Sequence, residues 1–316
     1  MTTTRNDLPQ TRGETLLTDS GLETTLIFHD GFDLPQFAAY TLLETTEGRR
    51  ALRAYFRRHL AIAADHGVGF LLEAPTWRAS RDWGERLGHA PDRVARFNRD
   101  AIALLADLRT ETPAVRPVVI SGNIGPRGDG YAPDTTMTED ESQAYHAEQI
   151  GWLAQTDADM VTAVTLGTVA EGVGVIRAAH ATGMPVVVSY TTETDGRLPD
   201  GTPLGRAIEE TDARTDGAAA YFMVNCAHPD HFRPALEAGQ GWLARIGGVR
   251  ANASRMSHAE LDEAAELDDG NPAELGRDYA RLRRLLPNLT VLGGCCGTDH
   301  RHVEAMADCC LHRASD

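Results

Sequence analysis

The stretch Val291-Leu292-Gly293-Gly294-Cys295-Cys296-Gly297-Thr298 has the form of a short strand that ends in glycines and turns toward a helix. Short apolar runs bounded by turn residues are typical of strands buried in parallel sheets. Runs of the same form recur along the whole chain. They predict eight strands, at residues 15–19, 68–73, 117–121, 160–165, 186–190, 221–226, 244–249 and 290–293.

Helical patterns lie between these runs. Five apolar residues step by three or four positions, which places them on one side of a helix: Val94, Phe97, Ala101, Leu105 and Leu108. Similar patterns predict helices at residues 47–66, 138–156, 169–181, 258–267 and 273–286. Because strands alternate with helices, we expect a parallel sheet, and eight such units favour a closed (β/α)₈ TIM barrel of the α/β class over an open doubly wound sheet.

The length and composition fit one globular domain. Hydrophobic residues make up 42% and charged residues 24% of the 316 residues, which is ordinary for a folded domain. No linker, repeat or low-complexity block divides the sequence, and α/β barrels reach this length as one domain. We therefore expect a single domain over residues 1–316.

The charge of the chain limits its partners. A net charge of -16 argues against a nucleic acid or an anionic membrane as partner, since both attract basic surfaces. No stretch approaches the roughly 18 apolar residues of a membrane span. Residues 1–7 carry no apolar run, so we expect no secretory signal and a cytoplasmic location. The sequence leaves the oligomeric state open, a homo-oligomer included.

The barrel prediction also locates the functional site. Active sites of these barrels lie at the carboxyl ends of the strands, in the loops that lead to the helices. Polar and glycine-rich residues should therefore follow the apolar runs directly. They do so at Asp19-Ser20-Gly21, Glu73-Ala74-Pro75-Thr76, Ser121-Gly122-Asn123, Thr191-Thr192-Glu193, Asn225-Cys226, Arg250-Ala251-Asn252 and Gly294-Cys295-Cys296.

Three of the five cysteines stand at predicted strand ends. Cys226 closes one run, and Cys295 and Cys296 close another, so the barrel mouth could bring them together. Zinc prefers four ligands in tetrahedral geometry, and catalytic sites keep one position open, which three thiolates would do. Buried cysteines also occur as inert small hydrophobes. Cys309 and Cys310 fall in a predicted terminal helix, and we interpret them as packing residues.

Two further motifs have competing interpretations. The loop at residues 122–130 could hold an anion with backbone N–H groups, but its glycines match neither a dinucleotide fingerprint nor a P-loop. A close backbone approach or a tight turn is favoured. His228 and His231 could extend a Cys/His ligand set, yet solvated imidazoles at a helix start are favoured. Serine hydrolase and zincin motifs are absent from the sequence.

Four motifs, in this order, resemble the homocysteine S-methyltransferase family over nearly the whole length: residues 19–24 (Asp-Ser-Gly-Leu-Glu-Thr), 122–126 (Gly-Asn-Ile-Gly-Pro), 224–226 (Val-Asn-Cys) and 293–297 (Gly-Gly-Cys-Cys-Gly). Members include S-methylmethionine- and betaine-dependent enzymes and the homocysteine module of methionine synthase, and they are zinc-containing (β/α)₈ barrels. The resemblance implies Zn²⁺ held by Cys226, Cys295 and Cys296. It also implies transfer of a methyl group from a small activated donor to a thiol, homocysteine, giving methionine.

The chain departs from the family pattern near the substrate. The opening Asp-Gly-Gly becomes Asp19-Ser20-Gly21, which keeps the carboxylate that resembles a substrate-amine contact. Many members carry a Glu-Thr pair at strand four, whose glutamate holds the homocysteine ammonium, and this chain has Val164-Thr165 there. The frequent Thr-Asn-Thr stretch after strand two corresponds to residues 74–76. We expect substrate contacts from Asp19, Glu73, Thr76, Asn123, Thr165 and Asn225.

The lost carboxylate leaves the identity of the thiol open, because an unpaired buried charge costs several kcal/mol. Glu73, Glu193 or Asp19 could compensate, and a thiol without an amino group would need none of them. Arg78 and Arg127 could pair with a substrate carboxylate or lie in solvent.

The resemblance also suggests the chemistry. A free thiol is mostly protonated at neutral pH, and binding to zinc would generate the thiolate nucleophile. A cationic methyl donor suits an acidic mouth, with Trp77 or Tyr131 as a cation–π contact. No cobalamin or folate module fits beside one barrel. The alternatives are a zinc hydrolase, for which three thiolates would be an unusual ligand set, and a zinc- or thiol-binding barrel that acts on a different thiol or lacks methyltransferase activity.

Overall fold

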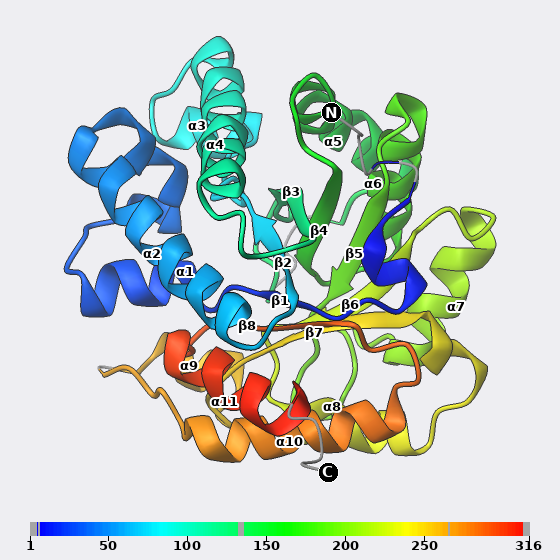
Figure 1. The fold of residues 1–316 in the computed structure, drawn as a ribbon. Coiled ribbons are helices and arrows are strands. Elements are labelled where there is room, and N and C mark those ends of the chain that lie inside the picture. Colours follow the sequence, from blue (N-terminus) through cyan, green and yellow to red (C-terminus); the bar gives the residue numbers. More distant parts are fainter. Residues whose placement is uncertain (1–4, 6, 132–135, 265, 312–316) are drawn as a thin grey trace.

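The computed structural model describes residues 5, 7–131, 136–264 and 266–311. Within these residues eight parallel strands pair in chain order and close into a barrel, with β1 bonded to both β2 and β8 (Figure 1). The strands are β1 (Leu16–Thr18), β2 (Gly69–Glu73), β3 (Val118–Ile124), β4 (Met160–Leu166), β5 (Val186–Tyr190), β6 (Tyr221–Asn225), β7 (Ile246–Ala251) and β8 (Val291–Gly294).

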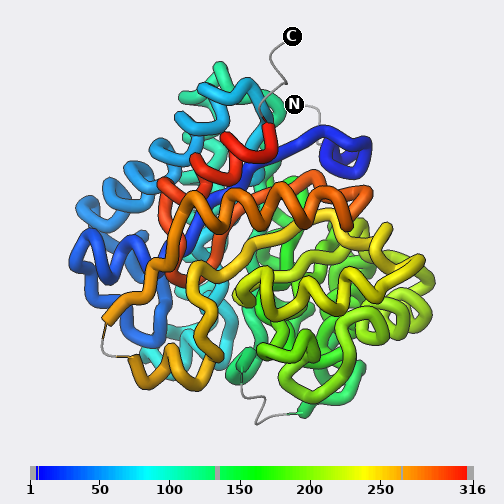
Figure 2. The backbone as a smooth tube through the Cα atoms, turned by 90° about the horizontal axis from the view of Figure 1, so that it is seen from below, coloured from blue at the N-terminus to red at the C-terminus, as the bar shows by residue number. Residues whose placement is uncertain are grey.

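Helices connect consecutive strands and cover the outside of the barrel. A helix of nine or more residues follows each strand, so the β/α unit repeats eight times. Figure 2 shows the last helix beside α2, which completes the ring. The helices are α1 (Leu22–Thr24), α2 (Thr46–Asp65), α3 (Arg81–Arg86), α4 (Pro91–Glu111), α5 (Glu139–Ala154), α6 (Val169–Thr182), α7 (Leu204–Arg214), α8 (Pro229–Glu237), α9 (His258–Asp262), α10 (Pro272–Leu285) and α11 (His300–Leu311).

The predicted fold class and all eight predicted strands are confirmed, with shifted ends. The prediction for β7 began at residue 244, but the strand starts at Ile246 because Gly241–Arg245 forms a 3₁₀ turn. Arg245 holds this turn in place through its ion pair with Asp212 at 2.6 Å. The predicted helix at 258–267 is shorter, since α9 ends at Asp262; residue 265 lies outside the described residues.

The sequence patterns predicted no range for α7 or α8, although a helix start was expected at His228. In α7 the buried residues follow the helical spacing of three and four, so the sequence does contain the pattern that indicates a helix there: Leu204, Ala207, Ile208 and Thr211. Helix α8 contains Pro234, which removes a backbone donor and weakens the pattern.

The barrel interior divides into an apolar base and a polar mouth. Residues near the starts of the strands form an apolar cluster that Leu8 joins from the amino-terminal segment: it includes Leu16, Leu71, Val119 and Val187. Nearer the carboxyl ends the buried side chains are polar, as in the 2.8 Å hydrogen bond between Ser121 Oγ and Thr162 Oγ1. A polar interior at the carboxyl ends is where barrel enzymes place their chemistry.

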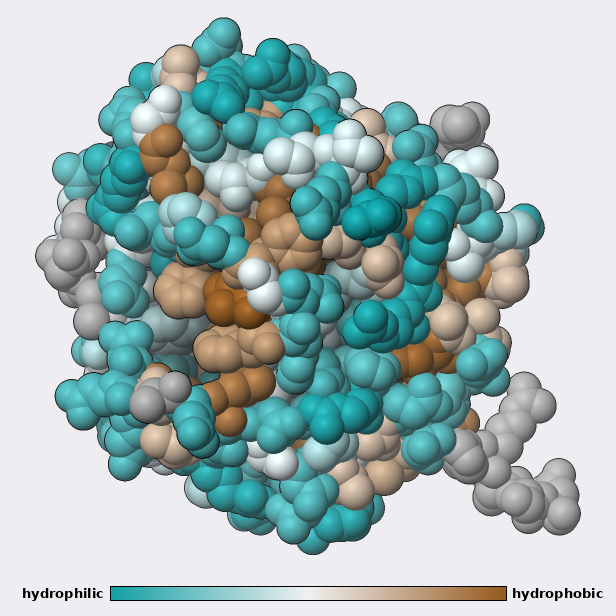
Figure 3. Space-filling view, turned by 90° about the vertical axis from the view of Figure 1, so that its left-hand side faces the viewer, coloured by the Kyte–Doolittle hydropathy of each residue, from teal (hydrophilic) through white to brown (hydrophobic). Residues whose placement is uncertain are grey.

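The mouth side of the barrel carries α1, α3 and α9, which lie to the left in Figure 1. Figure 3 views the molecule from that side and shows apolar residues gathered near the centre of a largely hydrophilic face. Phe28 and Phe37, both more than half exposed, belong to the segment between β1 and α2. The mouth is therefore not uniformly charged, although the chain has a net charge of -16.

The expectations about a membrane span and about Cys309 and Cys310 can also be compared with the structure. Within the described residues, no helix combines the length and the apolar composition needed to cross a membrane. On α11, Cys310 packs against the main core while Cys309 is exposed.

Tyr279 on α10 ties together β7 and β8 near the ends that face the barrel mouth. Its hydroxyl accepts from Ala251 N–H at 2.8 Å and donates to Gly293 O. We expect Tyr279→Phe to lower the free energy of unfolding by about 1–3 kcal/mol, because buried backbone groups lose their partner. Urea unfolding measures this, and Arg277→Ala, an exposed position on the same helix, should change it by less than about 0.5 kcal/mol. Equal unfolding midpoints for Tyr279→Phe and wild type would contradict the expectation.

Candidate metal centre

Two strand ends bring three cysteines together. Cys226 directly follows β6, and Cys295 and Cys296 directly follow β8. The Sγ atoms of all three lie within 4.8 Å of one another, and those of Cys226 and Cys296 are 3.2 Å apart. Tetrahedral zinc with Zn–S bonds near 2.3 Å would place its sulfurs about 3.8 Å apart. The donor set and its spacing therefore fit such a site, as the sequence predicted.

The backbone around the cluster adopts rare conformations. Cys226 has a φ of 55° and Thr165 on β4 a φ of 64°, a region that residues other than glycine seldom occupy and that concentrates at functional sites. Gly294 is also required, because a Cβ there would lie 2.1 Å from the Thr298 hydroxyl. The Cys226 N–H donates to Arg250 O at 2.9 Å, which holds the strained residue in place.

The three thiols interact strongly. Hydrogen bonds from Cys226 and Cys296 hold the pKa of the Cys295 thiol well below its usual range. The corresponding contacts raise the pKa of Cys226 and of Cys296.

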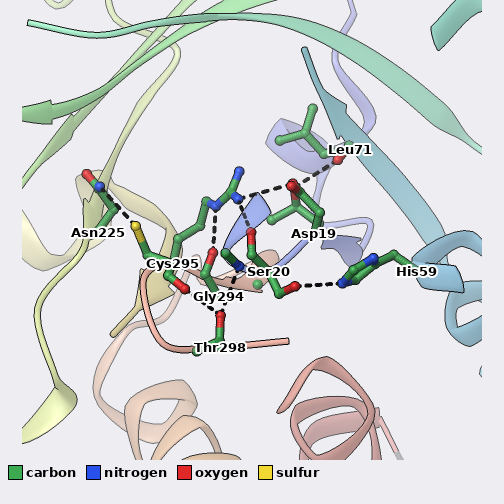
Figure 4. A network of polar contacts seen from close by, with 12 residues as sticks. Asp19, Ser20, His59, Leu71, Asn225, Gly294, Cys295 and Thr298 are labelled. Atoms are coloured by element: carbon green, nitrogen blue, oxygen red, sulfur yellow. Dashed lines mark hydrogen bonds and ion pairs between the residues drawn. The ribbon is translucent and has the colours of Figure 1, made fainter. Parts of the chain in front are cut away.

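Tyr131 and Asn225 contact the sulfurs from outside the cluster. The Tyr131 hydroxyl donates to Cys226 Sγ at 2.9 Å, and its ring packs on His258 with 4.2 Å between ring centres. The Asn225 amide lies 3.8 Å from Cys295 Sγ (Figure 4). Both side chains limit how the sulfurs can move.

A cavity lies beside the sulfurs. It offers about 80 Å³ to the centres of water-sized molecules, which is room for several waters, since one needs roughly 10–15 Å³. Cys295 and Cys296 line it together with five of the six predicted substrate residues: Asp19, Glu73, Asn123, Thr165 and Asn225.

Thr76 lies outside the residues that line this cavity. Its hydroxyl donates to Asn123 O at 2.7 Å and accepts from Asn123 N–H at 3.1 Å, so it joins the ends of β2 and β3. Thr165 and Asn225 brace the mouth in a similar way. The Asn225 amide bonds both the backbone N–H and the hydroxyl of Thr165 at 2.8 Å and accepts from Ser189 Oγ at 2.7 Å.

Asp19 is held by partners within the protein. Arg250 Nη2 lies 3.1 Å from its Oδ1, and the Tyr55 hydroxyl donates to its Oδ2 at 3.0 Å. Arg250 also donates to Gly294 O at 3.0 Å and to Ser20 O at 3.1 Å (Figure 4). Burial alone would lower the pKa of Arg250, but Asp19 and Glu73 outweigh it and raise the pKa. From the sequence, Arg250 could be identified only as a polar residue near a predicted strand end, and its contacts with Asp19, Ser20 and Gly294 were not predicted.

Ser20, which directly follows Asp19, is fixed by His59. Its hydroxyl lies 2.8 Å from His59 Nε2, and His59 Nδ1 lies 2.9 Å from Tyr55 O. Burial lowers the pKa of His59 to about 4, so the ring is neutral at pH 7. We infer that Nδ1–H donates to the carbonyl and that Nε2 accepts from Ser20.

Glu73 and Glu23 also line the cavity. Burial raises the pKa of Glu73 to about 7, although Arg250 opposes the shift, and burial likewise raises the pKa of Glu23 to about 7. Glu73 is 2% exposed, and neither of its oxygens has a hydrogen bond of good geometry in the described part of the chain, although the nearby hydroxyls of Thr162 and Ser121 act to lower its pKa. Val164 also lines the cavity.

The two candidate arginines have partners of their own. Arg127 pairs with Asp82 at 2.8 Å. The Arg78 guanidinium is buried between Trp77 and Trp83, 3.8 and 3.7 Å from their ring centres. One face of Trp77 is therefore covered and cannot serve a donor cation.

The remaining motifs have structural roles. His228 caps α8 by accepting from Asp230 N–H at 3.1 Å, as a helix start predicts, but it is buried rather than solvated. His231 contacts Arg255 O at 2.9 Å. The loop at 122–130 packs tightly, since a Cβ at Gly125 would lie 2.5 Å from Trp77 O. Neither histidine is part of the sulfur cluster.

The raised pKa of Glu73 predicts a pH effect in the metal-free protein. The folded carboxyl, with a pKa of about 7, holds its proton more tightly than the unfolded one, whose ordinary value is 4.5. Its stabilising contribution is thus full below about pH 4.5 and is lost as the pH rises to about 7. We expect wild type to lose up to about 3 kcal/mol relative to Glu73→Gln over this range. Urea unfolding at pH 5 and 7.5 measures it, with the exposed Glu85→Gln as control; a constant difference would contradict it.

Comparisons with known proteins agree with this geometry. Crystal structures of the homocysteine methyltransferase MmuM from Escherichia coli are similar: the oxidized form with 19% identity over 93% of this chain and 95% of that chain at a TM-score of 0.74, and the metallated form with 17% identity over 94% and 97% at 0.73. At such identity the likeness shows the fold. Among curated proteins no sequence matches. The family model for homocysteine S-methyltransferase matches residues 16–310, and the chain therefore belongs to that enzyme family.

Proposed function

We propose that the protein is a zinc-dependent S-methyltransferase that moves a methyl group from a small activated donor, such as S-methylmethionine or betaine, to homocysteine, giving methionine. The observation that carries this is the cluster of three cysteine sulfurs within 4.8 Å of one another beside a cavity at the barrel mouth. Family membership supports the same reaction class.

Cys226, Cys295 and Cys296 would hold the Zn²⁺. Three soft sulfur donors leave one position of a tetrahedral ion for a ligand. When bound, Zn²⁺ supplies a lowered pKa for the acceptor thiol, so that the thiolate exists at neutral pH.

The surrounding residues would hold this geometry. Asn225 braces β4, β5 and β6 through Thr165 and Ser189, and Arg250 ties β7 to the β1 and β8 ends. Preorganised sites of this kind need little rearrangement when the reaction occurs.

The charge of the mouth favours a cationic donor. Glu23 and Glu73, each with a pKa of about 7 and therefore partly ionised at neutral pH, line the cavity, and the chain as a whole is acidic. Acidic fields raise the local concentration of cations. Tyr131 also lines the cavity, and the face of its ring that does not meet His258 could contact a sulfonium or a quaternary ammonium. The partners we propose are therefore a small thiol and a small methyl donor, in the cytoplasm.

One observation favours a second candidate. Val164 leaves β4 without the carboxylate that binds an ammonium group in many relatives, so the barrel could act on a different thiol or bind one without methyl transfer. A zinc hydrolase is less suited to the site, since hydrolytic zinc sites use mainly histidine and carboxylate ligands.

Zinc content and product formation test the function together. We expect about one zinc per chain by elemental analysis, because three thiolates suffice for a catalytic site. Cys226→Ala, Cys295→Ala and Cys296→Ala should each lose most of the zinc and all methionine formation from homocysteine and S-methylmethionine or betaine. Cys309→Ala, on the exposed side of α11, is the matched control and should retain both.

Two results would count against this assignment. If Cys296→Ala retained its full zinc content, the three cysteines would not be the metal site. Tight zinc binding without methyl transfer to any thiol would favour the binding barrel instead.

A further inference from the structure

The position that binds the substrate ammonium in many relatives is apolar here. Val164 on β4 is 8% exposed and lines the cavity, and its side chain offers no hydrogen-bond acceptor. An ammonium group that leaves water for such a cavity needs a carboxylate, because an unpaired buried charge costs several kcal/mol. An amino-acid acceptor therefore requires an acidic side chain on another strand.

Asp19 is poorly suited to this role. Its carboxylate already accepts from Arg250 at 3.1 Å, from Tyr55 at 3.0 Å and from Thr18 at 3.1 Å. Breaking a buried ion pair is strongly destabilising, since it leaves the other charge without a partner. The charge of Asp19 is thus committed to Arg250.

Glu73 on β2 has the opposite properties. It is 2% exposed, it lines the cavity, and neither Oε1 nor Oε2 has a hydrogen bond of good geometry within the described residues. The hydroxyls of Ser121 and Thr162, which bond each other at 2.8 Å, lie near enough to lower its pKa slightly but leave it without an ion pair. It pairs in register with Ser121 on β3. Two positions further along β3, Asn123 also lines the cavity, and its Oδ1 is a second buried acceptor without a partner among the described residues. An ammonium group carries three donors and no acceptor, which matches these atoms.

The same cavity also offers unpartnered donors. Arg250 Nη1 and Trp77 Nε1 are buried and lack a partner in the part of the chain described. No ion pair within 4.0 Å joins Glu73 to Arg250 among these residues. Opposite charges that share a cavity without pairing leave room for the two charged groups of a zwitterion. Unsatisfied buried polar groups are rare in folded proteins and call for a ligand or water.

From these contacts we propose that Glu73, with Asn123 Oδ1, receives the ammonium group of an amino-acid thiol and so replaces the strand-four glutamate of its relatives, an inference that rests on the function proposed above. Arg250 Nη1 and Trp77 Nε1 receive the carboxylate. Glu193 is absent from the lining residues, and Glu23 is more exposed than Glu73.

The test is equilibrium binding of two probes to the zinc-loaded protein by calorimetry. L-Methionine carries the ammonium group, and 4-(methylsulfanyl)butanoate is the same molecule without it. Neither probe is a thiol, so binding needs no turnover. We expect wild type to bind methionine about 10–100-fold more tightly, as a hydrogen-bonded charge contributes. Glu73→Gln should lose most of this preference and keep its affinity for the butanoate.

Rescue and control variants sharpen the result. Adding Val164→Glu to Glu73→Gln returns a carboxylate to β4 and should recover at least part of the preference. Glu193→Gln is the matched control and should behave as wild type. If Glu73→Gln does not fold, wild type still provides a test: its affinity for methionine should rise as the pH increases from 5.5 to 8, while its affinity for the butanoate changes less.

Equal affinities of wild type for the two probes would overturn the assignment, as would a loss of preference in Glu23→Gln but not in Glu73→Gln. The outcome is separable from that of the methyl-transfer assay. Methyl transfer to a thiol without an amino group, together with equal binding of methionine and the butanoate, would contradict the role of Glu73 and leave the proposed reaction class intact. A preference for methionine that depends on Glu73, without methyl transfer to any thiol, would support the role of Glu73 and contradict the proposed reaction.

Discussion

The buried ion pair between Arg250 and Asp19 is the interaction on which the mouth of the barrel depends. Arg250 rises from β7, yet its guanidinium bonds Asp19 and Ser20 O at the end of β1 and Gly294 O at the end of β8. Three strand ends are thereby fixed by one side chain. A buried pair of this kind contributes little net stability, but its geometry is costly to disturb.

The sulfur cluster follows from that constraint. Cys295 comes directly after Gly294, and the backbone of Arg250 accepts from Cys226 N–H at 2.9 Å. The same arginine therefore contacts both segments that carry the cysteines. Asp19 is committed to this structural role, whereas Glu73, one strand away on the same cavity, has no ion pair within the described residues.

Much of this was readable from sequence, for local reasons. Apolar runs that end in glycine or polar residues marked every strand, and cysteines at two of those ends marked the cluster. Arg250 could not be identified as its brace, because Ser20, one of its partners, lies 230 positions away in the chain. The burial of His228 and the hydrogen bonds of Thr76 with the Asn123 backbone were not predicted for the same reason. The surroundings of a side chain are set by elements that are distant in sequence.

The pairing of β1 with β8 has a consequence for how the chain reaches this state. Thr290 Oγ1 donates to Gln10 O across 280 positions of sequence, and Leu16 pairs with Val291. Contacts of such long sequence separation make folding slow. During synthesis the ribosome releases seven strands before the eighth can seal the ring, and until then the nascent sheet has two open edges that invite association between chains. Two of the three sulfurs follow that eighth strand, so the sulfur cluster forms only when β8 has joined the barrel.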